Sequence, residues 1–305
     1  MAIGGSLVRY EADLSAVPAG LPLVISLSGF ADAGSVISQV REVLIEDQEP
    51  VRLVTFSNDE LLDYRSRRPV MEFRRDHVAD YRPLELALDL LRDAVGRPYL
   101  LLHGYEPDFR WEQFSQTVIG YIQRLQVSGS SWVHSIPFPI PHTRNLGLAI
   151  SGNQPEIAER KAEWRPQTQV PGNVLHLLEF ELSKIDQPIT GYVLLVPHYL
   201  ADNEYPSACV FAMEQLMAHN GLVFEMDHVR DSAVEFNRKL TEQLSTNEEL
   251  AQLVANLESG YATVAGRSDS DFSAKQFSEP DANQLADQLE NFLAAQNREE
   301  QDGSN

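Results

Sequence analysis

Several loops of this sequence carry side chains suited to acid–base chemistry or to holding an anionic ligand. Eight residues form the candidate ligand-binding set: Gly29, Asp32, Gly34, Glu106, Arg110, His142, Arg144 and His198. Carboxyl and imidazole groups act as general acids and bases, and an arginine binds a carboxylate or phosphate through two hydrogen bonds. The set therefore suits an anionic or carbonyl-bearing ligand, although it specifies no reaction and assigns no catalytic residue.

The loops with these side chains follow apolar runs that have the composition of buried strands. The four pairs of run and loop residue are 21–27 with Asp32, 99–102 with Glu106, 132–136 with His142 and 192–196 with His198. Open α/β sheets bind ligands beyond the carboxyl ends of their strands. We therefore expect these four side chains to gather along one edge of a parallel sheet.

The first loop, from Gly29 to Gly34, opens onto a helical pattern and has two interpretations. Backbone N–H groups of such a loop can hold an anion, but the spacing matches neither the three-glycine dinucleotide motif nor the phosphate loop. Asp32 would also repel a phosphate. The sequence favours the second interpretation, in which the two glycines permit a tight turn and Asp32 caps the helix.

The histidines and arginines also leave alternatives open. His103, His142 and His198 lack a spacing such as His-Glu-x-x-His, so a metal or acid–base cluster depends on their convergence in the fold. Otherwise they are polar groups that satisfy loop backbones. Arg110 and Arg144 have acidic neighbours, so internal salt bridges are as consistent with the sequence as ligand binding. We predict no metal and no cofactor.

Charge and cysteine content bound the class of protein. The net charge of −21 over 305 residues argues against nucleic acid and anionic membranes as partners. It fits solubility or a partner with a basic face. Cys209 is the single cysteine, which excludes an intramolecular disulfide, and its apolar neighbours predict a buried structural thiol. The first residues lack a signal-peptide pattern and no run approaches about 18 apolar residues, so we expect a cytoplasmic protein.

Alternating strand and helix patterns predict an α/β fold, with a mostly parallel sheet covered by helices on both faces. The expected strands are 21–28, 52–56, 70–73, 99–103, 132–136 and 189–196. The expected helices are 34–45, 83–95, 111–125, 173–182 and 206–218.

The character of the chain changes after about residue 224. From Glu225 to the end, 17 acidic residues face 6 lysines and arginines. We predict four parts: an α/β core domain over 1–224, an acidic helical hairpin over 225–263 broken near Asn247, a linker over 264–283, and a short helix with a disordered tail over 284–305.

Five motifs together resemble one protein family. They are Gly29–Gly34, Tyr64–Pro69, Gly104–Trp111, Pro141–Arg144 and Val196–Tyr199 with Pro206. In order and spacing they are similar to the bacterial, especially actinobacterial, branch of the proteasome assembly chaperone family, second type. The resemblance implies a three-layer α/β/α fold of the phosphorylase/hydrolase-like kind and homo-oligomers, and in eukaryotic and archaeal members the chaperoning of proteasome α-subunits.

Two further properties of that family do not match this sequence. Bacterial members are often described as ATP-grasp carboxylate-amine ligases, but we find no glycine-rich lid or Mg²⁺-binding carboxylate pattern here. Some members dock on proteasome pockets through a terminal hydrophobic-Tyr-any residue motif. This sequence ends Asp302-Gly303-Ser304-Asn305, so we do not expect that docking mode.

Two hypotheses for the function follow. The first is a non-enzymatic, homo-oligomeric protein-binding or assembly-chaperone-like factor with an unknown client, because no complete catalytic motif is found, including the Gly-x-Ser-x-Gly elbow of serine hydrolases. The second is a small-molecule enzyme of hydrolase or ligase type that uses the polar side chains at the strand ends.

Overall fold

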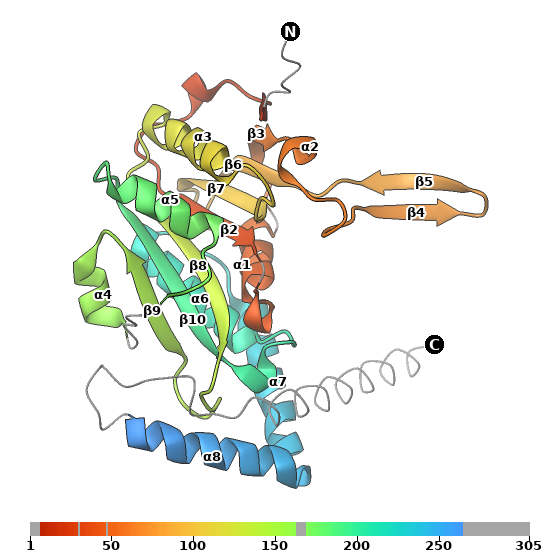
Figure 1. Cartoon of the computed structure of the whole chain (residues 1–305), viewed down its shortest axis with the longest axis vertical. Helices are drawn as coiled ribbons and strands as arrows, with labels where there is room; N and C mark the ends of the chain where they lie inside the picture. Colours follow the sequence, from red (N-terminus) through yellow and green to blue (C-terminus); the bar gives the residue numbers. More distant parts are fainter. Residues whose placement is uncertain (1–6, 30, 47, 163–168, 265–305) are drawn as a thin grey trace.

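A computed structural model describes residues 7–29, 31–46, 48–162 and 169–264 of the chain. Within this part, eight strands form one sheet in the order β1-β3-β6-β7-β2-β8-β10-β9 (Figure 1). Their bounds are β1 Val8–Tyr10, β2 Leu23–Ser28, β3 Val51–Phe56, β6 Leu86–Arg92, β7 Pro98–Tyr105, β8 Ser130–Phe138, β9 Gly147–Gly152 and β10 Ile189–Pro197. The neighbours β7, β2, β8 and β10 are parallel, and β3 runs the same way. The predicted mostly parallel sheet is confirmed, with antiparallel strands added on both sides of its centre.

Helices cover both faces of the sheet, which gives the predicted three-layer α/β/α fold. One face carries α1 (Val36–Ile45) and α6 (Pro206–Asn220), and the other carries α3 (Trp111–Arg124) and α5 (Val174–Ser183). Successive residues of a strand point to opposite faces. Leu101 therefore belongs to the core beneath α1 and α6, whereas its neighbours Leu100 and Leu102 belong to the core beneath α3 and α5. Both cores depend on the same central strands.

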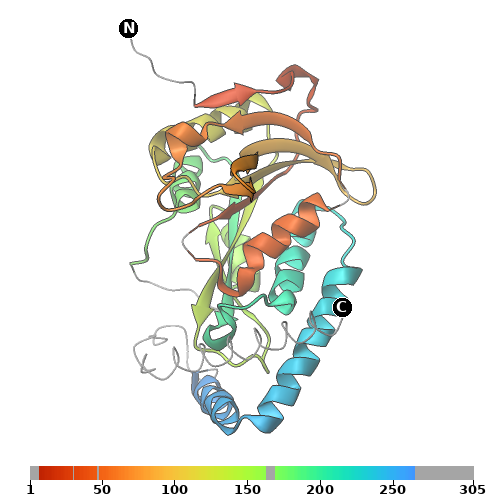
Figure 2. The same ribbon diagram turned by 90° about the vertical axis from the view of Figure 1, so that its right-hand side faces the viewer.

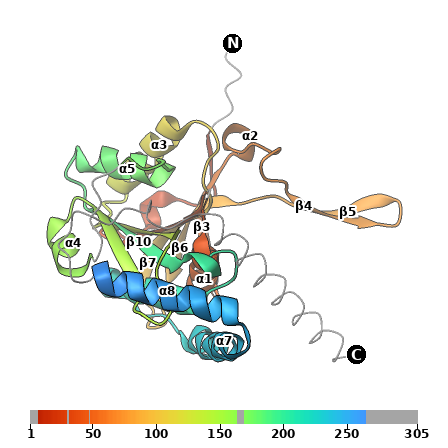
Figure 3. The same cartoon turned by 60° about the horizontal axis from the view of Figure 1, so that its bottom comes forward.

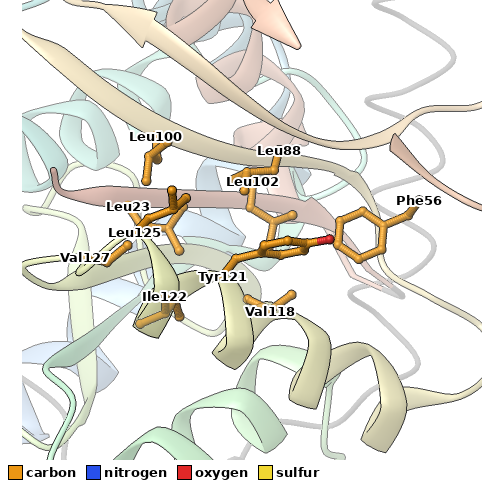
Figure 4. Close-up of a pocket in the computed structure, with 10 residues that line it drawn as sticks. All are labelled: Leu23, Phe56, Leu88, Leu100, Leu102, Val118, Tyr121, Ile122, Leu125 and Val127. Atoms are coloured by element: carbon orange, nitrogen blue, oxygen red, sulfur yellow. The ribbon is translucent and has the colours of Figure 1, made fainter. Parts of the chain in front are cut away.

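The core beneath α3 is closely packed. Figure 4 shows the apolar side chains that meet between this helix and the sheet, including Val118, Ile122 and Leu102. The void between them measures about 10 Å³, which is about the space that one water molecule needs. This face of the fold therefore holds packed side chains, and the space is too small for a ligand.

One predicted helix is wrong. The segment 83–95, expected to be helical, forms the strand β6 between β3 and β7. Leu86, Leu88 and Leu90 recur at every second position, which is the period of a strand. Pairing with two neighbouring strands fixes that pattern. Two strands were not predicted: β1, because it is only three residues long, and β9, because it follows a polar loop.

A two-stranded arm leaves the body of the molecule next to α2 (Asn58–Leu61) (Figures 1 and 3). It consists of β4 (Val70–Arg74), which the sequence predicts, and β5 (His77–Arg82), which it does not. Every residue of both strands is exposed to solvent. We call this segment, Val70–Arg82, the arm.

Two helices extend the core at its C-terminal side, as predicted. Helix α7 (Asp227–Thr246) packs on α6, and α8 (Glu248–Val264) leaves its lower end in a different direction (Figure 2). The backbone N–H of Leu250 donates to the side-chain oxygen of Asn247 at 3.0 Å, so Asn247 caps α8. No described helix combines the length and hydrophobicity that a membrane span requires.

The division into domains stays a prediction. The predicted short helix and tail over 284–305, and all but the first residue of the predicted linker over 264–283, lie outside the described residues.

A buried charged group joins three strands on the face that carries α1. The Asp89 carboxylate on β6 accepts from Arg52 Nε of β3 at 2.5 Å and contacts His103 Nε2 of β7 at 2.8 Å. Asp89 and His103 are 1% and 4% exposed. A second carboxylate, that of Glu85, lies 3.4 Å from Arg52 Nη2 and is mostly exposed to solvent. His103 is therefore bound within the sheet, away from the candidate site.

We expect Asp89→Ala to lower the free energy of unfolding by about 3–5 kcal/mol, because it leaves the buried His103 and the half-buried Arg52 without their carboxylate partner. The matched substitution Glu85→Ala removes an exposed partner of the same arginine and should cost less than about 1 kcal/mol. Urea unfolding followed by circular dichroism measures both. Equal losses in the two variants would contradict a structural role for the buried contact.

Candidate functional site

Four of the candidate loops share one edge of the sheet. The parallel strands β7, β2, β8 and β10 are consecutive neighbours, so their carboxyl ends lie on the same side. Glu106 follows β7, Asp32 follows β2, and His198 follows β10. His142 comes four residues after the end of β8. The expected common edge is present, and the question is whether the side chains meet there.

Asp32 caps α1. Its Oδ1 accepts from the backbone N–H of Ile37 at 2.7 Å, and its Oδ2 accepts from the backbone and hydroxyl of Ser38 at 3.2 and 3.0 Å. Gly34 has a φ of +71° in the preceding turn, a conformation that favours glycine. A Cβ at Gly34 would lie 3.0 Å from the Cβ of Tyr205. The turn-and-cap interpretation of this loop therefore accounts for both residues.

Glu106, which directly follows β7, contacts the start of α5 and the loop at Gly29. Its carboxylate Oε1 accepts from the backbone N–H of Val174, the first residue of α5, at 2.7 Å. Glu106 is only 6% exposed, and a Cβ at Gly29 would lie 2.7 Å from its other carboxylate oxygen. Gly29 thus leaves space for a carboxylate of the same chain. A negative charge is favourable at the positive N-terminal end of a helix, so Glu106 stabilises the start of α5.

The two histidines lie over the ends of β8 and β10. The Tyr199 hydroxyl accepts from the His142 backbone N–H at 2.7 Å and contacts the His142 ring nitrogen Nδ1 at 2.6 Å. The buried Nδ1 of His198 has no hydrogen-bond partner among the described residues. Burial lowers the pKa of both imidazoles, although the charge of Glu258 opposes this effect at His142. Both rings are therefore neutral groups at neutral pH.

The two candidate arginines form internal ion pairs. Arg110 Nη2 lies 2.6 Å from Glu60 Oε2, and Arg144 Nη2 lies 2.7 Å from Glu258 Oε2 on α8. Thr143 also donates to Glu258. Through these contacts α8 covers the loop after β8, where Tyr261 packs beside Phe138 and Ile140. The salt-bridge interpretation of both arginines agrees with the structure.

His134 is a buried titratable residue that the sequence analysis missed. It lies on β8 with 5% of its surface exposed, and burial lowers its pKa to about 4, helped by His176 and opposed by Asp32. The His176 ring packs edge-to-face on Trp132, which precedes His134 by two residues on β8. The available signal was a histidine on the same strand face as a large aromatic residue.

The geometry distributes the candidate groups rather than joining them. The carboxylates of Asp32 and Glu106 accept hydrogen bonds from backbone N–H groups at the starts of α1 and α5. Arg110 and Arg144 pair with glutamates. Among residues 7–264 with their gaps, no group of three or more side chains suited to a metal occurs. The exception among the candidate residues is His198 Nδ1, a buried ring nitrogen with no hydrogen-bond partner among the described residues. Ligand binding at this edge stays a prediction.

The buried His134 predicts a pH dependence of stability. The pKa of His134 is about 4 in the folded chain and 6.5 in an unperturbed histidine. As the pH falls from 6.5 to 4, the unfolded chain therefore takes up a proton at this residue and the folded chain does not. The free energy of unfolding falls as the pH decreases through the same window, by at most about 1.4 kcal/mol per pH unit from this residue. His134→Leu should make the slope shallower by that amount.

Urea unfolding across this pH window measures the slope, with His77→Leu, a substitution at an exposed histidine of the arm, as the matched control. The control should keep the slope of the unmodified chain. If both variants keep it, His134 does not contribute to the pH dependence.

Known structures share this fold. A Mycobacterium tuberculosis protein of unknown function is 34% identical, with a TM-score of 0.77, and the match covers 84% of this chain and 91% of that chain. A Corynebacterium glutamicum protein of unknown function is 29% identical, with a TM-score of 0.79 and coverage of 86% and 98%. A proteasome-assembly chaperone homologue from M. tuberculosis is 19% identical, with a TM-score of 0.70 and coverage of 77% and 100%, a likeness of fold alone.

No curated protein matches the chain. The family model of the PAC2 family matches residues 26–244, which include the second half of β2, all of β7, β8 and β10, and all the candidate residues. This match confirms the family that the five sequence motifs indicated. The chain belongs to the PAC2 family.

Proposed function

We propose that this protein is a cytoplasmic, homo-oligomeric, assembly-chaperone-like factor that binds a protein client and catalyses no reaction. The observation that carries the proposal is the internal use of the charged groups at the carboxyl edge. Asp32 and Glu106 cap helices and Arg144 holds α8. A catalytic edge needs groups that face a substrate, whereas these groups face their own chain.

Family membership supports the chaperone-like part of the proposal. One protein with the same fold is described as a proteasome-assembly chaperone homologue. That protein is 19% identical to this chain, so it supports the kind of activity and does not identify the client. The client of this chain therefore has to be found by capture.

Charge favours a client with a basic face. The chain carries a net charge of −21, and a surface of one sign accelerates the association of a partner with the opposite sign. Two exposed acidic residues lie near the start of α7: Glu225 just before the helix and Asp231 in its second turn. The helix itself packs on α6. We assign this surface of α7 to client binding.

Capture from a native lysate with the full chain tests the client-binding proposal. We expect a stoichiometric protein partner that is lost at high salt, because screening weakens exposed charge contacts. A chain with Glu225→Lys and Asp231→Lys should retain about tenfold less of it. Absence of any stoichiometric partner at low salt would overturn the proposal.

The matched control is Glu112→Lys with Glu156→Lys, which changes the net charge equally on α3 and α4. It should retain the partner. If both pairs lose it equally, net charge rather than the α7 surface governs capture.

A second candidate function rests on His198. Its buried Nδ1 lacks a hydrogen-bond partner among the described residues, so a small ligand with a polar group beside the end of β10 would satisfy it. A melting-temperature screen with metabolites and nucleotides tests this small-molecule role. We expect His198→Ala and His142→Ala to abolish any shift, and Glu112→Ala to keep it. If no compound shifts the melting temperature of the unmodified chain, the second candidate fails.

A further inference from the structure

Three lysines occur in the described part of the chain, and one of them lies in different surroundings from the others. Lys184 Nζ lies 2.7 Å from Glu181 Oε1, and Lys239 Nζ lies 3.9 Å from Glu235 Oε1. Lys161 forms no ion pair with any described residue. The charged form of Lys161 therefore lacks the carboxylate that stabilises the charge of the other two lysines.

Contacts from two elements fix the position of the Lys161 amine. Helix α4 (Pro155–Lys161) packs on the edge strand β9 and ends with this lysine (Figure 1). The half-buried Lys161 Nζ donates to Gln215 Oε1 of α6 at 2.8 Å and lies 6.0 Å from the centre of the Tyr192 ring of β10. The Tyr192 hydroxyl in turn lies 3.0 Å from His219 Nδ1 of α6. The amine is thus held between α6 and the sheet rather than extended into solvent.

The titratable neighbours of Lys161 are basic or neutral groups. Burial lowers the pKa of the Lys161 ammonium, and the positive charge of Arg160 lowers it further. Burial also lowers the pKa of His219, and the Lys161 charge acts in the same direction. Burial raises the pKa of Tyr192 to about 12, so its hydroxyl is uncharged at neutral pH. Desolvation and a neighbouring cation are the two conditions that make a lysine amine nucleophilic.

Arg160 indicates which class of reagent this amine would meet. The Arg160 side chain is exposed and forms no ion pair with a described residue. A guanidinium binds a phosphate group through two hydrogen bonds, and an uncharged amine attacks an activated acyl carbon. A small acyl phosphate contains both groups in one molecule. The phosphate would contact Arg160 while the acyl carbon faces the adjacent Lys161.

We propose that Lys161 is a modification site that accepts the acyl group of a small acyl phosphate held by Arg160. The lone pair of Lys161 Nζ forms a bond to the acyl carbon, and the bond from that carbon to the phosphate oxygen breaks. The phosphate leaves with the electron pair of that bond and takes up the proton that the amine releases. The products are an acylated lysine, which has lost its positive charge, and inorganic phosphate. This site is independent of client binding and goes beyond the proposed function.

Acetylation of the folded, full-length chain by acetyl phosphate tests the inference. Mass spectrometry measures the initial rates at Lys161, Lys184 and Lys239 at mildly alkaline pH. We expect Lys161 to react about tenfold faster than either of the others, because more of its amine is uncharged and its reagent is bound. In guanidinium chloride the unfolded chain should show similar rates at all three. Equal rates in the folded chain, or a preference that persists after unfolding, would overturn the inference.

Arg160→Gln separates binding of the phosphate from reactivity of the amine. Loss of the neighbouring positive charge raises the pKa of Lys161, which slows every acylating reagent to the same extent. The uncharged reagent N-acetoxysuccinimide measures that common effect. With acetyl phosphate we expect a further loss of about tenfold, because only this reagent has a phosphate for the guanidinium to bind. Equal slowing with both reagents would exclude acyl phosphates as the donor class.

Two further variants control for the assignment. Arg124→Gln changes an exposed arginine of α3, on the other face of the sheet, and should leave both rates at Lys161 unchanged. Lys161→Arg should abolish the fast reaction and leave the rates at Lys184 and Lys239 as they are. A fast adduct that remains in Lys161→Arg places the preferred site elsewhere and overturns the inference. Circular dichroism checks that each variant is folded.

Discussion

The fold depends on two buried or half-buried carboxylates that fix helices to the carboxyl edge of the sheet. Asp32 holds the start of α1 on one face, and Glu106 holds the start of α5 on the other. Each satisfies backbone N–H groups that a helix N-terminus otherwise leaves unpaired. The two contacts place a helix against each face of the same parallel strands, so both hydrophobic cores depend on them.

Because these acidic residues contact their own chain, the polar loops at the carboxyl edge have a structural role. In open α/β folds the carboxyl ends of the strands hold ligands, and polar loops there suggest chemistry. Here the loop after β8 is covered by α8 through Arg144 and Glu258, and Tyr261 closes over Phe138. Helix α8 thus belongs to the architecture of the edge at the end of β8.

The sequence predicted the centre of the fold because that part follows local rules. The buried runs of β2, β7, β8 and β10 and the amphipathic helices α1, α3 and α5 contain their own patterns. The strand β6 was mistaken for a helix, because Pro83 and a leucine-rich segment also satisfy the signals of a helix start. The strand becomes evident only when β3 and β7 lie beside it, and the buried Asp89 has a partner on each of them.

The candidate site was predicted in its location but not in its contacts. The common edge follows from the repeated order of strand and loop. The partners of the side chains lie far along the chain: Val174 is 68 residues from Glu106, Tyr199 is 57 from His142, and Glu258 is 114 from Arg144. Local sequence contains no signal for such pairs, whereas the cap by Asp32 spans only five and six residues and was predicted.

The single thiol has a consequence for handling the protein. Cys209 on α6 is fully buried, as its apolar neighbours predicted, and burial raises its pKa to about 12. Alkylating and oxidising reagents attack the thiolate, which the folded chain neither forms nor exposes at neutral pH. The rate at which a maleimide labels the chain therefore reports how often α6 separates from the sheet, without any engineered probe.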